Sequence, residues 1–164
     1  MKRALWFIAV LLVGCSRGSG PAVPASTGAA ASPPAAPPAF VATDDTGARI
    51  GLAGPAKRIL SLTPGGTEML FAAGAGDRII ATVQDADVPE AAQSIPRVGD
   101  ATALDYEKVV NTHADVVVAW LNINSATMIE KLRSLKLPVY LISATRLQDI
   151  PRSIERLGAL TGNE

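Results

Sequence analysis

The sequence is poor in the residues that build disulfides and zinc sites. It contains one cysteine and one histidine among 164 residues. A single cysteine cannot form a disulfide within the chain, and a single histidine without cysteine partners cannot build a Cys/His zinc site. Charge of neither sign predominates, because 15 Lys and Arg balance 15 Asp and Glu. Nucleic-acid binding needs a clustered basic surface, so we expect no nucleic-acid partner.

Long apolar runs are also scarce, and the one present is short. About ten almost wholly apolar residues, 4–13, follow the basic start Met1-Lys2-Arg3. A bilayer-spanning helix needs roughly 20 residues, whereas this length suits a signal peptide. The run ends in Leu12-Val13-Gly14-Cys15, which resembles the bacterial lipobox, whose cysteine is acylated and becomes the mature N-terminus. We expect residues 1–15 to be a lipoprotein signal peptide and Cys15 the lipidation site; the alternative is a membrane anchor with a coincidental cysteine.

Bulky and charged side chains are nearly absent from residues 16–39. This segment has one charge, at Arg17, and six of the 12 prolines. Such a composition buries too little apolar surface to offset the entropy of ordering, so we expect a disordered Ala/Pro-rich tether. A proline-rich segment runs extended at about 3.1 Å per residue and could hold a domain away from a membrane. The alternative is an unstructured remnant with no spacer role.

Residues 40–164 remain to form a folded domain. They contain all 15 acidic residues but only 12 of the 15 basic ones, which gives the domain a net charge of −3. Its first part reads as a β-hairpin, because two short strands, 40–43 and 48–52, flank an Asp/Gly-rich turn.

After the hairpin, apolar strand patterns alternate with amphipathic helix patterns. The predicted strands are 58–62, 78–83, 115–120 and 138–142, and the predicted helices are 67–73, 105–112, 125–135 and 147–160. Residues 84–104 read as a loop with one helical turn near Glu90. The Val run at 116–118 is typical of a strand covered on both faces. The fold class is therefore α/β: a Rossmann-like lobe with a mostly parallel sheet flanked by helices, preceded by the hairpin.

Open parallel sheets bind ligands at the carboxyl ends of their strands. The first such loop contains Pro64, Gly65 and Gly66, whose small residues allow close approach and whose amide groups lie at a helix start. We expect these three residues to form a wall of a ligand site. A helix cap with a tight turn is the alternative, and it applies most directly to Thr67 and Glu68. The glycine patterns of nucleotide-binding loops are absent from the sequence.

A second candidate lies at the end of the strongest strand. Trp120 is followed by a loop that contains Asn122 and Asn124, and an aromatic beside amides suits a cleft wall. We expect Trp120 and Asn122 to bind ligand; a core or rim tryptophan is the alternative. His113 precedes a strand and is expected to be an exposed loop residue on the opposite edge. The sequence shows no nucleophile–base pair, which argues against an enzyme.

Several segments together resemble one family. They are Thr43-Asp44-Asp45-Thr46-Gly47, residues 57–64 with 67–70, residues 74–78, Pro96-Arg97-Val98-Gly99 and residues 114–120. In order and spacing they are similar to the periplasmic solute-binding proteins for cobalamin, ferric siderophores and haem, the capture subunits of ABC importers. The resemblance implies a binding protein with no catalytic step and no cofactor, whose ligand is a corrinoid or an iron chelate.

The resemblance also implies roles for particular residues. Trp120 matches a tryptophan that packs on the corrinoid in cobalamin-binding members, and Asp85 falls near the position of a ligand-binding tyrosine. Glu107 matches a surface glutamate that docks on arginines of the permease dimer; the alternative is a solvated helix carboxylate.

Family members have two lobes joined by a long helix, with the ligand between the lobes. This sequence stops at Glu164, where that helix would begin, so residues 40–164 are expected to be the N-terminal lobe, truncated relative to the family.

The expected function is a lipid-anchored substrate-binding subunit of an ABC importer. It would be exported and face the periplasm, or the outside of the cell membrane in a Gram-positive organism. The alternatives are a nucleotide-binding enzyme on a doubly wound sheet and a structural envelope lipoprotein.

Overall fold

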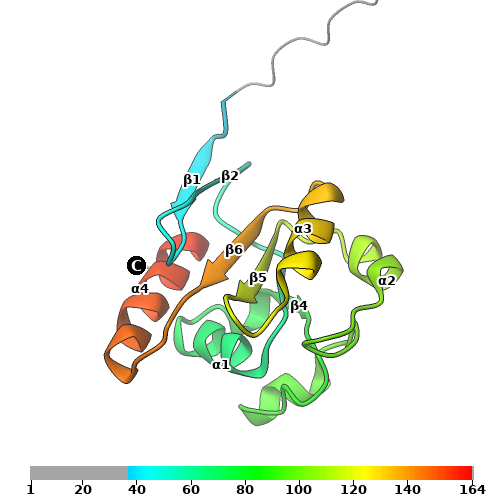
Figure 1. The fold of residues 1–164 in the computed structure, drawn as a ribbon. Coiled ribbons are helices and arrows are strands. Elements are labelled where there is room, and N and C mark those ends of the chain that lie inside the picture. Colours follow the sequence, from blue (N-terminus) through cyan, green and yellow to red (C-terminus); the bar gives the residue numbers. More distant parts are fainter. Residues whose placement is uncertain (1–36, 164) are drawn as a thin grey trace, which may run out of the picture. The chain divides into compact units, whose positions relative to one another are not determined.

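The computed structural model describes residues 37–163 (Figure 1). The expected signal peptide, Cys15 and most of the expected tether lie outside the described residues. A hairpin, a four-stranded sheet and four α-helices make up the described part. The elements are β1 (Phe40–Thr43), β2 (Arg49–Leu52), β3 (Ile59–Ser61), α1 (Pro64–Ala72), β4 (Ile79–Ala81), α2 (Tyr106–Asn111), β5 (Val116–Trp120), α3 (Ala126–Ser134), β6 (Val139–Ile142) and α4 (Ile150–Thr161), with short 3₁₀ turns η1 (Gly76–Arg78), η2 (Glu90–Ser94) and η3 (Leu147–Asp149).

The α/β architecture predicted from the alternating pattern is confirmed. The sheet has the strand order β4-β3-β5-β6, and its neighbouring strands pair in parallel. Strands β1 and β2 form a separate antiparallel pair. Because all four sheet strands run the same way, their carboxyl ends lie along one edge and their amino ends along the other.

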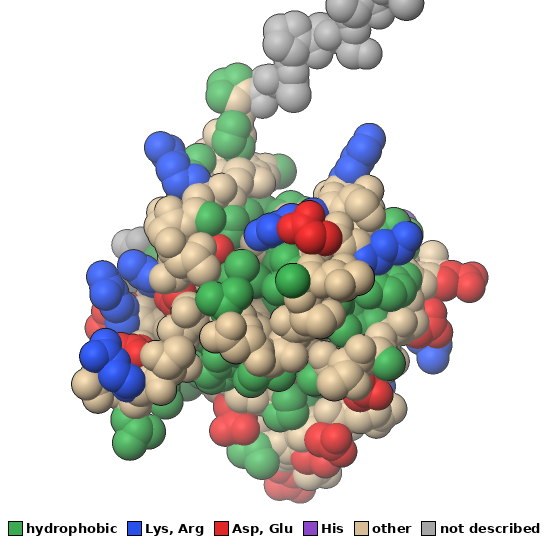
Figure 2. All heavy atoms as spheres, viewed as in Figure 1, with side chains coloured by type: hydrophobic (Ala, Val, Ile, Leu, Met, Phe, Trp, Pro, Cys, Tyr) green, Lys and Arg blue, Asp and Glu red, His purple; other side chains and the backbone are tan. Residues whose placement is uncertain are grey.

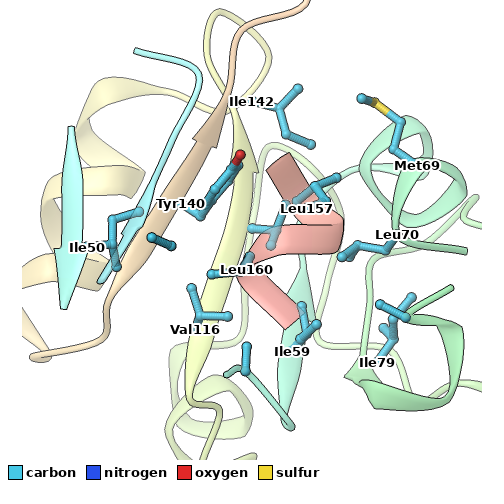
Figure 3. Packing of buried hydrophobic residues seen from close by; sticks show 14 of the residues in the cluster. Ile50, Ile59, Met69, Leu70, Ile79, Val116, Tyr140, Ile142, Leu157 and Leu160 are labelled. Atoms are coloured by element: carbon cyan, nitrogen blue, oxygen red, sulfur yellow. The ribbon is translucent and has the colours of Figure 1, made fainter. Parts of the chain in front are cut away.

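Helices cover both faces of the sheet, which explains the apolar strands. On one face, Met69 and Leu70 of α1 and Leu157 and Leu160 of α4 pack in a cluster with Ile59 and other strand residues (Figure 3). Leu60, the next residue of β3, belongs to the cluster on the other face, with side chains of α2 and α3. Successive residues of a strand point to opposite faces, so both must be apolar when both faces are covered.

Helices α2 and α3 begin within one residue of the prediction, whereas α1 and α4 begin three residues away from it. Helix α1 begins at Pro64, three residues before the prediction, because the Thr63 hydroxyl caps it by accepting from the Gly66 N–H at 3.0 Å. Proline fits the first turn of a helix, where its missing N–H has no partner to lose. Helix α4 begins at Ile150 rather than residue 147, and the preceding turn is the 3₁₀ segment η3.

The hairpin is fastened to the sheet by two aspartates. The Asp44 carboxylate accepts from Thr46 and Ala48 within the turn and from the Leu141 N–H of β6 at 3.4 Å. The Asp45 carboxylate accepts from the Ser143 N–H at 3.1 Å and pairs with Arg156 of α4 at 3.1 Å. The turn therefore joins the hairpin to β6 and α4.

Candidate functional site

The candidate site lies at the carboxyl edge of the sheet, where Trp120 ends β5. Trp120 is partly buried and packs against the core beneath α1 and α4. A Cβ built on Gly65 would lie 2.9 Å from Cζ3 of the Trp120 ring. Gly65 therefore lets the indole lie directly against the first turn of α1. The structure brings together these two residues, which the sequence placed in a loop and at the end of a separate strand. Trp120 packs against the core and remains partly exposed.

A group of buried hydroxyls fixes the start of α1 at this edge. The Thr67 hydroxyl lies 2.9 Å from the Ser61 hydroxyl and 2.8 Å from the Thr82 hydroxyl. Ser61, Thr67 and Thr82 are fully buried and come from β3, α1 and the end of β4. Thr67 thus has the structural role that the sequence left open, whereas Glu68 is exposed.

The first turn of α1 offers fewer amide groups than expected. Pro64 has no N–H, and the Gly66 N–H is bonded to the Thr63 hydroxyl. Of the three residues 64–66, Gly65 has the N–H that remains available to a ligand, and Gly65 lies beside the Trp120 ring. Within this turn, Pro64 and Gly65 are half-buried and Gly66 is buried, so Gly65 is the member of the expected wall that meets Trp120.

Asn124 organises the edge, and sequence reasoning did not assign it a role. Its Oδ1 accepts from the Trp120 N–H at 2.8 Å, and its Nδ2 donates to the carbonyls of Leu62 at 3.2 Å and Ala101 at 3.0 Å. It is 3% exposed. One amide side chain therefore holds three loops from distant parts of the sequence around Trp120. In the sequence, the only indication of this role is that a short polar residue lies between Ile123 and Ser125, which caps α3.

Asn122 and Asp85 occupy exposed turns. Asn122 has φ +72° in the turn between Trp120 and Asn124, and Asp85 has φ +62° in the loop after β4. Asn and Asp tolerate this left-handed conformation better than most residues. Both side chains lie at the carboxyl edge, but Asn124 rather than Asn122 bonds to the Trp120 backbone.

The edge also exposes apolar side chains. Three of the five exposed large hydrophobic residues of the described part follow β4, β5 and β6: Val88 (59%), Ile123 (51%) and Leu147 (84%). Figure 2 shows hydrophobic side chains along the lower border of the molecule, among acidic ones. These three side chains come from separate loops, so they add apolar surface at several points of this edge.

Hydrogen bonds lower the pKa values of two aspartates in these loops. Hydrogen bonds from the Thr102 side chain and backbone, and from the Ala103 backbone, lower the pKa of Asp100. The loop that contains Asp100 also contains Ala101, whose carbonyl accepts from the Asn124 side chain. The Arg146 side chain, by hydrogen bonding, lowers the pKa of Asp149 to about 2 at the start of α4. Both loops therefore keep ionised aspartates at neutral pH.

Glu107 stands apart from Trp120, on the first turn of α2. Its side chain is exposed, and the neighbouring Lys108 pairs with Asp105 at 3.7 Å. His113 is exposed at the end of α2, where its φ is +50°. Among residues 37–163, no three His, Cys, Asp or Glu side chains are grouped as a metal site would require. The same part of the chain has no helix long and apolar enough to cross a membrane.

The vitamin B12-binding protein of Vibrio campbellii is 36% identical over 104 residues, which are 63% of this chain and 38% of that protein. The crystal structure of the periplasmic vitamin B12-binding protein of Vibrio cholerae aligns with a TM-score of 0.63 at 34% identity, over 66% of this chain and 43% of that one. A periplasmic haem-binding protein from Pseudomonas aeruginosa, 20% identical, shares the fold with a TM-score of 0.60, over 66% of this chain and 39% of that one.

The chain spans about two fifths of the length of the curated relatives it matches. The sequence profile that describes a periplasmic binding protein matches residues 59–164, more than half of the chain. With this match and the shared fold, the chain belongs to the periplasmic binding protein family.

Proposed function

We propose that the chain is the N-terminal lobe of a lipid-anchored solute-binding protein that captures cobalamin or an iron chelate for an ABC importer. The observation that carries the proposal is the Trp120 ring, seated on Gly65 at the carboxyl edge of the sheet. Flat, partly exposed aromatic surface suits a large apolar ring system such as a corrin. The curated relatives, which are named vitamin B12-binding proteins, support cobalamin as the first ligand to test.

Other residues take supporting roles in this proposal. Gly65 forms the floor on which the ring lies, and Asn122 and Asp85 supply polar groups at the same edge of the sheet. Glu107, exposed on α2, would contact basic residues of the permease dimer. Cys15 would carry the lipid that keeps the protein at the membrane, facing the periplasm or, in a Gram-positive organism, the outside of the cell. Ligand capture of this kind has no catalytic step.

The experiment uses the fact that the sequence has two tryptophans, Trp6 and Trp120. A chain that begins at Ser16 therefore reports on Trp120 alone by fluorescence. Cyanocobalamin, haemin and ferrichrome are titrated in turn, with calorimetry to separate binding from light absorption. We expect saturable binding of one of them, cyanocobalamin first. Failure of all three to saturate at about millimolar concentration would contradict the proposed ligand class.

Truncation of the aromatic ring tests its role directly. Trp120→Ala is expected to weaken ligand affinity by about 1–3 kcal/mol, because stacked apolar area is lost. Val110→Ala, which shortens another exposed apolar side chain on α2, is the matched control and should leave affinity unchanged. Equal affinity of the Trp120→Ala variant and the wild type, measured by calorimetry, would return Trp120 to a packing role.

A further inference from the structure

A hollow lies at the amino edge of the sheet, opposite Trp120, between β2 and the segment that joins α3 to β6. Its volume is about 390 Å³. Its lining includes three cationic residues, Arg49, Arg133 and Lys136, and no acidic residue. Figure 2 shows basic side chains over the upper part of the molecule, where Figure 1 places β2 and α3. The charge is local, because residues 40–164 as a whole have a net charge of −3.

The cations of this hollow are largely unneutralised. Within residues 37–163, neither Arg49 nor Lys136 forms an ion pair. Arg133 pairs with Glu130 at 3.0 Å, but both side chains are well exposed to solvent, where such a pair contributes little. Like charges around one hollow repel, so an anion that entered it would be stabilised.

The backbone of Lys136 gives independent support. Its φ is +62°, directly after α3, and its N–H donates to the Arg133 carbonyl at 2.8 Å. Helices commonly end with glycine in this left-handed conformation, because a side chain there is strained. A lysine at this position holds a charge at the hollow at the expense of local strain, which is often associated with function.

The N-terminal side of the folded part lies close by. The hollow shares Gly51 and Pro138 with a larger one, of about 690 Å³, whose wall includes Pro37 and Pro38. The chain thus enters the domain beside the basic hollow. If Cys15 carries a lipid, residues 16–36 connect it to Pro37, and the proline-rich composition of this segment predicts a reach of roughly 60 Å.

We infer that the basic hollow at Arg49, Arg133 and Lys136 is a docking site for the phosphate headgroups of an anionic membrane. The inference rests on the proposed function only for the lipid at Cys15, which brings the domain to the membrane. The hollow and Trp120 lie at opposite edges of a parallel sheet. A domain held through the hollow therefore keeps its ligand edge directed away from the lipid, open to solute.

The test uses the chain that begins at Ser16, which keeps the whole described domain but cannot be acylated at Cys15. Co-sedimentation with phosphatidylglycerol-containing vesicles is compared with sedimentation with pure phosphatidylcholine vesicles, at low salt. We expect binding to the anionic vesicles alone, and weaker binding as salt increases. Equal binding to both vesicles, or to neither, would overturn the inference.

Variants assign the binding to the hollow. Arg49→Gln and Lys136→Gly should each weaken vesicle binding about five-fold. Lys136→Gly should also raise the melting temperature, because glycine relieves the strained φ. The control, Lys108→Gln with Arg152→Gln, removes two charges elsewhere and should bind like the wild type. If the control binds as weakly as the Arg49→Gln/Lys136→Gly double variant, general charge explains the binding and the inference is wrong.

Two further measurements separate the alternatives. Inorganic phosphate and glycerol phosphate are titrated while the amide resonances of Arg49 and Lys136 are followed by NMR. Saturation at micromolar concentration would identify a site for a free anion and overturn membrane docking; only weak shifts are expected. Lipidation is measured separately, by mass spectrometry of the expressed full chain. An unlipidated Cys15 would contradict the proposed anchor without altering the vesicle result.

Discussion

Among single residues, Tyr140 has a buried hydroxyl that forms no hydrogen bond with the described part of the chain. The side chain is fully buried in β6. Burial, with a further contribution from the Asp45 carboxylate, raises the pKa of Tyr140 above its usual value. Burial therefore favours the neutral form of the phenol. The missing hydrogen bond of the buried hydroxyl is a separate cost to the stability of the folded state.

Tyr140→Phe is expected to stabilise the domain at neutral pH by about 1 kcal/mol, because it removes a buried hydroxyl without a partner. Above pH of about 10, the unfolded wild type releases the phenol proton and the folded state does not. The free energy of unfolding of the wild type should therefore fall as the pH rises above about 10. The variant has no phenol at position 140, so it should not show this part of the decrease. Urea unfolding of both proteins at neutral and alkaline pH measures the effect. A variant clearly less stable than the wild type at neutral pH would show that the hydroxyl is bonded.

Single residues also show where sequence reasoning reaches its limit. The position of Trp120 at the end of β5 was predictable, because the apolar Val run marks the strand that it ends. Asn124 was not, because its partners Leu62 and Ala101 are distant in the sequence and meet it only in the folded chain. The sequence offered Asn122 and Asn124 as similar neighbours, and the fold buries only the second.

The elements follow from the sequence where apolar periodicity is strong. The Val run of β5 and the amphipathic face of α3 predicted both elements within one or two residues. The start of α1 was missed, because glycine is a poor helix former and obscured the capping signal of Thr63 followed by proline. The attachment of the hairpin could not be read from the pattern, because Asp45 reaches Arg156 across more than a hundred residues.

Asp45 attaches the hairpin to the segment after β6 and to α4. The Asp45 side chain is 6% exposed and Arg156 is 28% exposed, so the pair is largely shielded from solvent. Asp45→Ala should destabilise the domain by about 3 kcal/mol, because it removes the carboxylate that pairs with a shielded guanidinium and accepts from the Ser143 N–H. The Ser153 hydroxyl would keep only the Asp149 carbonyl as its acceptor. Thermal or urea unfolding measures the loss.

The matched control for this change is Asp87→Ala. Asp87 also pairs with an arginine at 3.1 Å, but its side chain is 62% exposed. Its removal should cost less than about 1 kcal/mol. Similar losses for the two variants would show that the hairpin contributes no more than an exposed loop.

At the scale of the whole molecule, the two edges of the sheet differ in character. The carboxyl edge presents Trp120 with exposed apolar side chains from three loops, and the amino edge presents the basic hollow. The parallel arrangement of all four strands separates these surfaces. The composition does not predict this difference between the two edges, because the positive and negative charges of the sequence are equal in number.

The site assigned to Trp120 is tested most sharply by mapping where cyanocobalamin contacts the folded domain. Amide and indole resonances of the chain from Ser16 are recorded by NMR during titration with cyanocobalamin. We expect the largest shifts at the Trp120 indole and the Gly65 amide, with the resonances of Arg49 and Lys136 unchanged. Shifts concentrated at the amino edge, or at neither edge while calorimetry shows binding, would contradict the assignment of the ligand site to Trp120.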